Sequence, residues 1–339
     1  MEIGYTPAVE VYGANAALIN ARLVDWEHVD AAGIESDQLK LTVNIEGLDG
    51  LPSFDNKIGL RVGYQETGLV DKGEFTVTRV TPQLFPALML IVATAAPFKV
   101  TDPTGFKARR SETYAMTTLG QVFRRVVARH GFTPRVAADL EAIAIVHIDQ
   151  SNETDASFLT RLAKRFDAVA KPVNDLYVLA RRGQLKTLSG KPMPKVTLSV
   201  TQDNRPGSKA FIAASIDSDA RIRVKGVKTT WWDGGSGKEI IVETGSEPFR
   251  KVRQRYQDAD EAKAAGEGEL RKAKRQETKL RIDCPGNPAF GAEGLVELDA
   301  TWPSFMRGDW SIDKVTSSGS RQQSYRCTIE ASYPDGKQE

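Results

Sequence analysis

The stretch Gln38-Leu-Lys-Leu-Thr-Val-Asn-Ile45 decides the fold class of this chain of 339 residues. Apolar residues occupy every second position in it, and polar residues lie between them. Because neighbouring side chains of a strand point to opposite faces, the pattern predicts a strand with one buried face. Similar runs begin at Ile58 and Phe75, and another covers Leu88 to Val92. Short strands joined by turns rich in Gly and Pro predict an antiparallel barrel or sandwich.

The hydrophobic period changes to that of a helix between about residues 112 and 182. Thr118 with Gln121 is a capping box ahead of one amphipathic helix, which we expect to end near Gly131. A second helix is expected to begin at Thr154 and to be followed by a short strand. This part of the chain is predicted to be a small α/β insertion.

After the insertion, alternating strands return, and one long polar helix interrupts them. Asp258 with Glu261 forms its N-terminal cap, and the helix is expected to end near Arg275. Its apolar residues are mostly alanine, so it is expected to cover a surface or meet a partner rather than to fill a core. Arg271 and Lys274 are therefore candidate assembly-interface residues.

Together the patterns predict a mainly β fold with an α+β insertion. Two related antiparallel β-barrel domains, residues 1–110 and 195–335, are expected to flank the insertion at 111–194. The long surface helix at about 258–275 is expected to lie within the second barrel, and residues 336–339 to form a C-terminal tail.

The composition argues against several classes of function. The 46 basic and 44 acidic residues leave a net charge of +2, too small for a strong attraction to nucleic acid or an anionic membrane. The basic clusters around Arg110 and Arg129 are expected to be solvated faces. The N-terminus lacks the basic and apolar regions of a signal peptide, and the longest apolar stretch, Leu84 to Phe98, is too short to span a bilayer.

Two cysteines are too few for a disulfide framework. Cys284 and Cys327 each keep the alternation of the strand around them. Both are therefore predicted to be small core residues of a protein made in a reducing cytoplasm, and whether they are neighbours stays open.

No residue pattern predicts a catalytic, cofactor or metal site. The stretch Asp25 to Asp30 contains Glu and His side chains that would point to opposite faces of a strand, and no second histidine is near. His147 with Asp149 lacks a marked nucleophile. The glycine-rich segment after Trp232 continues into a β-branched run, which predicts a hairpin turn and not a phosphate loop. We therefore expect a protein that is not an enzyme.

Three tryptophans beside turns are candidate anchors of an assembly interface: Trp231, Trp232 and Trp302. Packing in the core at the end of a barrel is the alternative role for each of them. Tryptophan suits both roles because it combines a large apolar ring with one N–H donor.

The segment from His147 to Ala163 resembles the signature of the phage late control gene D family, in which a Gln precedes Glu-Ser-Asp and Phe-Leu-x-Arg-Leu-Ala. The stretch from Gly308 to Val315 is similar to the family's Gly-x-Trp-x-Ile-x-x-Val. Thr154 stands where Ser is usual, and Thr316 stands where the family often has His. The signature residues are Gln150, Glu153, Asp155, Phe158, Leu159, Arg161, Leu162, Ala163 and Trp310.

The resemblance implies a structural tail hub, similar to the hub of myophage baseplates and to the N-terminal part of VgrG proteins. In such relatives three copies form a ring of six similar barrels, which joins the sixfold tail tube to the threefold central spike. The implied partners are further copies of the chain, a tail tube or tube-initiator protein, the spike, the tape measure protein and baseplate wedge proteins. Assembly in the bacterial cytoplasm and a final place in a virion or tailocin baseplate are also implied.

Two other functions stay open at this stage. Carboxylates such as Glu293, Glu297 and Asp299 could form the pair of a tail-associated cell-wall hydrolase. The region 112–182 could instead be a peptidoglycan-binding module. The resemblance fits an infectious phage and a phage-derived bacteriocin equally, since both use such a hub.

Overall fold

The computed structural model contains two compact units, and each is built from separate stretches of the chain. The first unit comprises residues 1–99, 194–216 and 280–331, and the second comprises residues 100–193, 217–279 and 332–339. The structure describes residues 5–33, 36–50, 52–53, 56–95, 108–173, 176–181, 195–200, 213–218, 224–321 and 324–334. The expected tail at 336–339 lies outside these residues.

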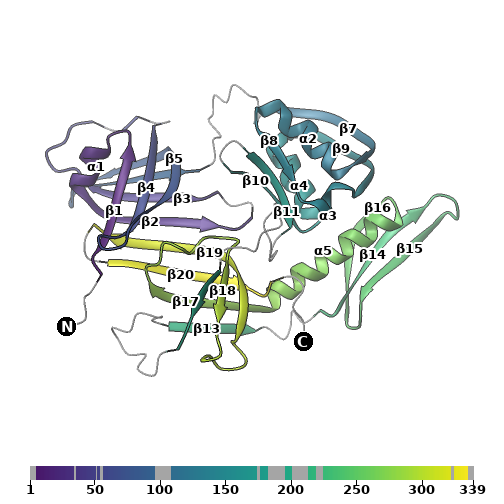
Figure 1. Cartoon of the computed structure of the whole chain (residues 1–339). Helices are drawn as coiled ribbons and strands as arrows, with labels where there is room; N and C mark the ends of the chain where they lie inside the picture. Colours follow the sequence, from purple (N-terminus) through teal and green to yellow (C-terminus); the bar gives the residue numbers. More distant parts are fainter. Residues whose placement is uncertain are drawn as a thin grey trace. The chain divides into compact units, whose positions relative to one another are not determined.

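The first unit is a twelve-stranded sheet (Figure 1). Its main path runs β1-β4-β5-β6-β3-β2-β19-β20-β17-β13, and β18 pairs with both β19 and β12. The elements are β1 (Pro7–Gly13), α1 (Ala16–Arg22), β2 (Leu23–Ala31), β3 (Gln38–Asn44), β4 (Lys57–Tyr64), β5 (Gly68–Gln83), β6 (Leu88–Thr94), β12 (Lys195–Leu198), β13 (Ala213–Ser218), β17 (Thr278–Pro285), β18 (Leu295–Leu298), β19 (Gly308–Ser320) and β20 (Ser324–Ser332).

The mainly β prediction is confirmed, and the alternation that predicted it is the one the fold uses. β3 covers Gln38–Asn44, and the side chains of Leu39, Leu41 and Val43 are all buried. The pairing is not wholly antiparallel as expected, because β12 and β18 are parallel. About a hundred residues separate these two strands, which is ample for the long crossover that a parallel pair needs.

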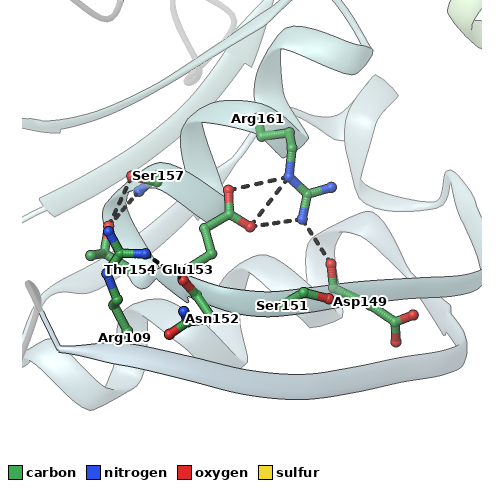
Figure 2. A pocket seen from close by; sticks show the side chains of 8 residues that line it. All are labelled: Arg109, Asp149, Ser151, Asn152, Glu153, Thr154, Ser157 and Arg161. Atoms are coloured by element: carbon green, nitrogen blue, oxygen red, sulfur yellow. Dashed lines mark hydrogen bonds and ion pairs between the residues drawn. The ribbon is translucent and has the colours of Figure 1, made fainter.

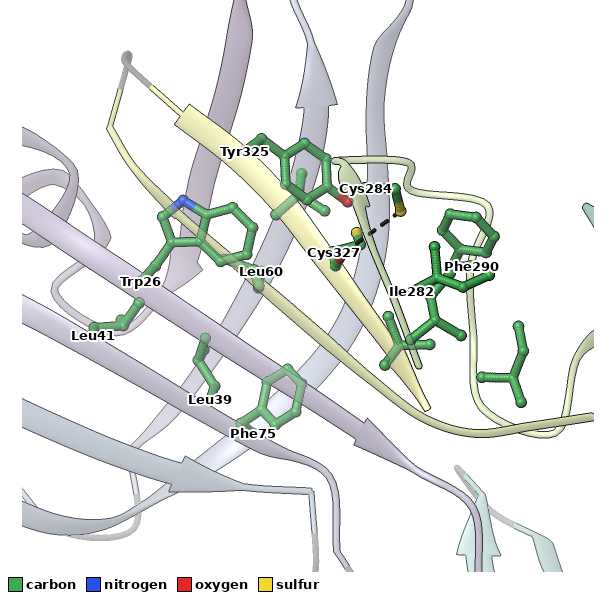
Figure 3. Packing of buried hydrophobic residues seen from close by; sticks show 14 of the residues in the cluster. Trp26, Leu39, Leu41, Leu60, Phe75, Ile282, Cys284, Phe290, Tyr325 and Cys327 are labelled. Carbon is green, nitrogen blue, oxygen red and sulfur yellow. Dashed lines mark hydrogen bonds between the residues drawn. The ribbon is translucent and has the colours of Figure 1, made fainter. Parts of the chain in front are cut away.

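The two strand-rich halves of the chain share one sheet and one core. β2 of the N-terminal half pairs antiparallel with β19 of the C-terminal half. Leu39 and Phe75 of the first half lie in the same hydrophobic cluster as Ile282 of the second (Figure 3). The expected bounds of two barrel domains, residues 1–110 and 195–335, stay a prediction; both stretches contribute to the first unit.

Both cysteines are buried in this core, as predicted. β17 and β20 are neighbours in the sheet, and Sγ of Cys284 donates to the carbonyl oxygen of Cys327 at 3.5 Å. The thiols are free. Burial raises the pKa of the Cys284 thiol far above its usual range, so the thiolate form is disfavoured.

The first part of the second unit contains the predicted insertion. The capping box of Thr118 and Gln121 is present at α2, and Thr154 caps α4 through the N–H of Ser157 at 3.1 Å. β7 and β9 form an antiparallel pair, and a small sheet has the order β10-β11-β8. The elements are β7 (Arg109–Thr118), α2 (Leu119–Val127), the 3-10 helix η1 (Ala128–His130), β8 (Thr133–Val136), α3 (Ala138–Glu141), β9 (Ala144–Thr154), α4 (Asp155–Arg165), β10 (Ala168–Val173) and β11 (Leu176–Arg181).

The long polar helix, α5 (Ala259–Glu277), belongs to this second unit rather than to the strand-rich unit, where it was expected. It covers a three-stranded sheet of β14 (Gly226–Asp233), β15 (Lys238–Gly245) and β16 (Phe249–Tyr256). Asp258 caps it as predicted, accepting from the N–H of Glu261 at 2.8 Å. Small residues of α5 allow the close approach, since the Thr229 hydroxyl donates to the carbonyl of Ala262 at 2.8 Å.

Candidate functional site

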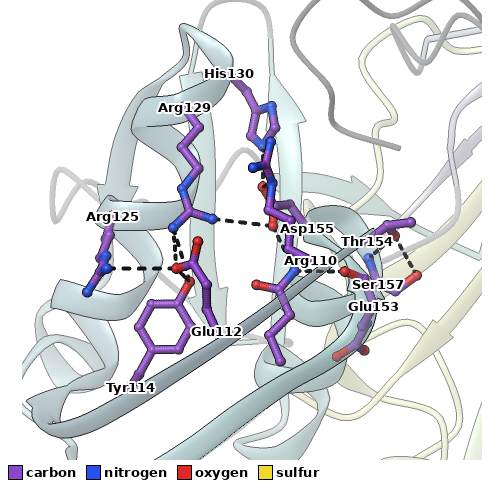
Figure 4. Close-up of polar contacts among 11 residues, drawn as sticks. Arg110, Glu112, Tyr114, Arg125, Arg129, His130, Glu153, Thr154, Asp155 and Ser157 are labelled. Atoms are coloured by element: carbon purple, nitrogen blue, oxygen red, sulfur yellow. Dashed lines mark hydrogen bonds and ion pairs between the residues drawn. The ribbon is translucent and has the colours of Figure 1, made fainter. Parts of the chain in front are cut away.

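The signature residues between Gln150 and Ala163 lie where β9 ends and α4 begins. Asp155, the first residue of α4, is completely buried. Its carboxylate accepts a hydrogen bond from Nε2 of Gln150 at 2.7 Å and lies 2.8 Å from Nε2 of His130. Nε of Arg110 is 3.3 Å and Nη1 of Arg129 is 3.6 Å from the same carboxylate (Figure 4). These five residues are called the Asp155 network below.

A carboxylate that is removed from water needs partners that replace its hydration. Asp155 also lies at the N-terminus of α4, where the helix dipole favours a negative charge. Arg110 comes from β7, Gln150 from β9 and His130 from η1. One buried charge therefore holds four elements together, and the network is a structural junction.

Glu112 extends the Asp155 network along β7. Nη2 of Arg129 donates to Glu112 at 2.6 Å, and the Tyr114 hydroxyl donates to it at 3.1 Å (Figure 4). Partial burial raises the pKa of Glu112, but the hydrogen bonds from Arg129 and Tyr114 outweigh it and hold the pKa below its usual range. Arg129 is thus fixed between two acids.

A polar hollow of about 530 Å³ lies at the same junction of strand and helix (Figure 2). Arg161 crosses it, with Nη2 2.8 Å from Glu153 and 2.7 Å from the carbonyl oxygen of Asp149. The lining residues are Arg109, Asp149, Ser151, Asn152, Glu153, Thr154, Ser157 and Arg161.

The groups that line this hollow are bonded to one another. The Thr154 hydroxyl donates to the Ser157 hydroxyl at 2.9 Å, and Arg109 donates to the carbonyl oxygen of Asn152 at 2.9 Å. A serine activated for nucleophilic attack would instead hydrogen-bond to a general base. These hydrogen bonds hold the turn between β9 and α4 in place.

The other signature residues pack in the two cores. Phe158 stacks on Tyr114 with ring centroids 5.4 Å apart. Trp310 is buried in the first unit, where its indole N–H donates to the carbonyl oxygen of Met306 at 2.8 Å. Three further signature residues of α4 are buried: Leu159, Leu162 and Ala163.

The three candidate interface tryptophans differ in how far they are buried. Trp302 is only 3% exposed, and its indole N–H donates to the carbonyl oxygen of Leu198 at 2.8 Å. It is therefore a core residue and not an interface anchor, since its ring and its donor are both engaged. Trp231 is half-buried and packs against Tyr256 beneath α5. Trp232 is 52% exposed and stays a candidate.

Of the two candidate interface residues of α5, one is engaged within the second unit and the other stays a candidate. Nε of Arg271 lies 3.8 Å from the buried carboxylate of Asp167, so its charge is engaged within the second unit. Lys274 is half-buried in the last turn of the helix, and its role in an interface remains a proposal.

The sequence prediction missed the most connected side chains of the junction. Arg110 and Arg129 were expected to be solvated, yet both contact the buried Asp155. This expectation was wrong because a cluster of like charges in sequence does not show which acid folds onto it. The signal that could have found them is Asp155 itself, a carboxylate at the start of a helix whose apolar face includes Phe158 and Leu162.

The side chains of the motifs that were rejected as metal and nucleotide sites make contacts within the fold. Glu27 pairs with Lys40 at 2.7 Å on the surface of β2, while His28 is buried against Phe75. No group of three or more metal-binding side chains occurs among the residues that the structure describes. The glycine-rich segment is the predicted hairpin turn, in which Asp233 accepts from the N–H of Gly235 at 3.0 Å.

The other chemical candidates are also engaged. His147 and Asp149 form an exposed pair at 3.0 Å, and the Thr113 hydroxyl donates to Asp149. Hydrogen bonds from Thr113, and then from His147, lower the pKa of Asp149. Glu297 pairs with Lys195 at 3.1 Å. Within the described ranges, no helix has the length and apolar character needed to cross a membrane.

Comparison with known proteins gives two curated relatives, while no protein-family model matches. The chain is 35% identical over 185 residues to the probable baseplate hub protein of Escherichia phage 186, which is 54% of this chain and 46% of that protein. It is 35% identical over 188 residues to the corresponding protein of Escherichia phage P2, covering 55% and 48%. The chain resembles phage baseplate hub proteins. It spans about half the length of these curated relatives.

Solved structures extend the likeness of fold to nearly the whole chain. The 43 kDa tail protein of prophage MuSo2 from Shewanella oneidensis has a TM-score of 0.65 at 13% identity, over 97% of this chain and 99% of that one. A tail protein from Neisseria meningitidis has a TM-score of 0.66 at 13% identity, over 98% of each chain. The expected resemblance to tail hub proteins is confirmed, and the relatives carry the names of structural proteins rather than of enzymes.

Proposed function

We propose that this chain is the structural hub of a contractile phage-type tail. The observation that carries the proposal is the 35% identity with two baseplate hub proteins over more than half of this chain. The whole-length likeness of fold to phage tail proteins supports it. The Asp155 network supports it too, because the signature residues stabilise a fold rather than assemble a reaction centre.

In the proposed assembly three copies form a ring. Each copy contributes two strand-rich halves, so a threefold ring presents six similar elements and joins a sixfold tail tube to a threefold central spike. The close union of the halves through β2 and β19 suits this role, since both must keep a fixed spacing in every copy. The ring nucleates the assembly of tube and baseplate.

The partners in this proposal are a tail tube or tube-initiator protein, the central spike, the tape measure protein and the baseplate wedge proteins. Assembly takes place in the bacterial cytoplasm, and the hub then remains in the baseplate of the virion or tailocin.

The copy number and the place in the tail test the proposal. Native mass spectrometry of the full chain at micromolar concentration is expected to show three copies, and gold labelling of purified tails is expected to mark the end that carries the baseplate. Deletion of the gene is expected to abolish assembled tubes, and expression of the chain to restore them. A chain that stays monomeric and is absent from tails contradicts the proposal.

A further inference from the structure

The two edge strands of the sheet β15-β14-β16 differ in charge: β15 carries acidic and apolar side chains, and β16 carries basic ones. Among the residues that the structure describes, β15 and β16 are the outer strands, and α5 covers one face. On β15, Ile241 is 55% exposed although it lies in a regular strand. An exposed apolar edge strand is a template for pairing with another chain.

The uncovered face has a regular pattern of side chains. Strand register places Glu239, Ile241 and Glu243 of β15 on the face of Trp232, because each lies opposite a residue of β14 that points that way. α5 occupies the other face, on which Trp231 packs against the cluster of Tyr256.

Three exposed cations occupy alternate positions of β16: Lys251, Arg253 and Arg255. Lys251 and Arg255 lie opposite residues 228 and 230 of β14, which share the face of Trp232, and Arg253 lies in the segment between them, where the register of β16 with β14 shifts. Within the described part of the chain, Lys251 and Arg253 have no ion-pair partner.

We propose that β15 of one copy pairs with β16 of the next copy, so that this sheet continues from chain to chain. Along β15 the uncovered face presents acid, isoleucine and acid, and along β16 the exposed residues at positions 251, 253 and 255 are all cations. In either strand direction, the two carboxylates then meet Lys251 and Arg255, and Ile241 lies against the aliphatic stem of Arg253.

Charge selects this head-to-tail pairing over the alternatives. Two β16 edges would bring cations against cations, which is unfavourable for directly opposed residues. Glu243 already binds Lys228 at 2.7 Å and Glu239 lies 3.5 Å from Arg255, but a carboxylate has lone pairs for a second donor. Because the two edges differ, the contact is heterologous and can close into a ring.

This inference rests on the proposed function, in which copies of the chain form a ring. A cysteine pair tests it on the full chain: Ile241→Cys with Arg253→Cys. Within one copy β14 separates these positions by about two strand spacings, roughly 10 Å, which is too far for a disulfide. Mild oxidation is therefore expected to give covalent dimers and trimers on a non-reducing gel. The matched control, Ile240→Cys with Arg253→Cys, points to the other face and is expected to give less than a tenth as much.

Charge-reversal variants provide a second test of the strand pairing. Lys251→Glu with Arg253→Glu is expected to shift the midpoint of association at least tenfold towards higher concentration in analytical ultracentrifugation. Adding Glu239→Lys and Glu243→Lys to that variant is expected to restore the midpoint, and Lys263→Glu on the exposed side of α5 to leave it unchanged.

The outcomes separate this inference from the function on which it rests. A wild-type trimer that forms no 241–253 cross-link, and whose midpoint does not respond to the charge variants, overturns the strand pairing but leaves the hub in place. A wild-type chain that is monomeric and absent from tails overturns both.

Discussion

Asp155 carries its charge in a place that water does not reach, and its partners come from three other elements. Asp155→Asn keeps the shape but leaves the Arg110 and Arg129 charges without their buried acid. Removing one partner of a buried ion pair costs about 3–5 kcal/mol. Urea unfolding of the variant is expected to show a loss of this size. Asp149→Asn on the exposed side of β9, the strand that precedes α4, is the control, with an expected loss below about 1 kcal/mol.

His28 makes the stability of the first unit depend on pH. Burial lowers the pKa of His28 to about 4, Asp30 partly opposes this shift, and Lys72 adds to it. Between about pH 6.5 and 4 the unfolded chain binds a proton at this position that the folded chain does not. The stability that depends on neutral His28 is therefore complete above about pH 6.5 and is lost as the pH falls through 4.

The size of this effect is on the order of 3 kcal/mol, from 1.36 kcal/mol per unit of pKa difference. Urea unfolding measured across this pH range is expected to show it in the wild type, and His28→Gln to flatten the slope between pH 4 and 6.5. An unchanged slope in His28→Gln would assign the pH dependence to other groups.

At the scale of elements, the sequence predicts what is local. The starts of α2, α4 and α5 were predicted because the side chains of Thr118, Thr154 and Asp258 each accept from the N–H group three residues further on. The sheet on which α5 packs could not be predicted, because alternation shows that a strand face is buried but not which element buries it. The Asp155 network escaped prediction for the same reason, since His130 and Asp155 are 25 residues apart.

The position of α5 depends on charges at the turn after α4. Asp167 is buried in the left-handed region at φ 53°, and Nη2 of Arg275 donates to it. Asp167→Asn tolerates the same backbone conformation but removes the charge, so it isolates the ion pair. It is expected to cost about 3 kcal/mol and to speed hydrogen exchange along α5. Glu267→Ala, which removes an exposed contact with Arg271, is the control with an expected cost below about 0.5 kcal/mol.

At the scale of the whole molecule, strand-rich halves were predictable but their union was not. The run around Leu41 fixes a strand and its buried face, whereas the pairing of β2 with β19 joins positions nearly three hundred residues apart. Nothing in a period of two selects a partner strand at that distance. The expected division into consecutive barrels followed chain order, and the shared core follows strand pairing.

A shared sheet and core make the first unit one cooperative structure, and this can be tested by a substitution in one half and a measurement in the other. Leu41→Ala removes a completely buried side chain of β3, which costs roughly 2–5 kcal/mol. If both halves unfold together, the slowest amides of β3 and of β20 exchange only through the same global opening. Hydrogen exchange followed by mass spectrometry is then expected to speed up by the same factor in both strands, about thirtyfold or more.

Ile329→Ala in β20 is expected to act on β3 in the same way. Acceleration confined to the substituted half would instead mean two independent barrels, the arrangement that chain order suggests.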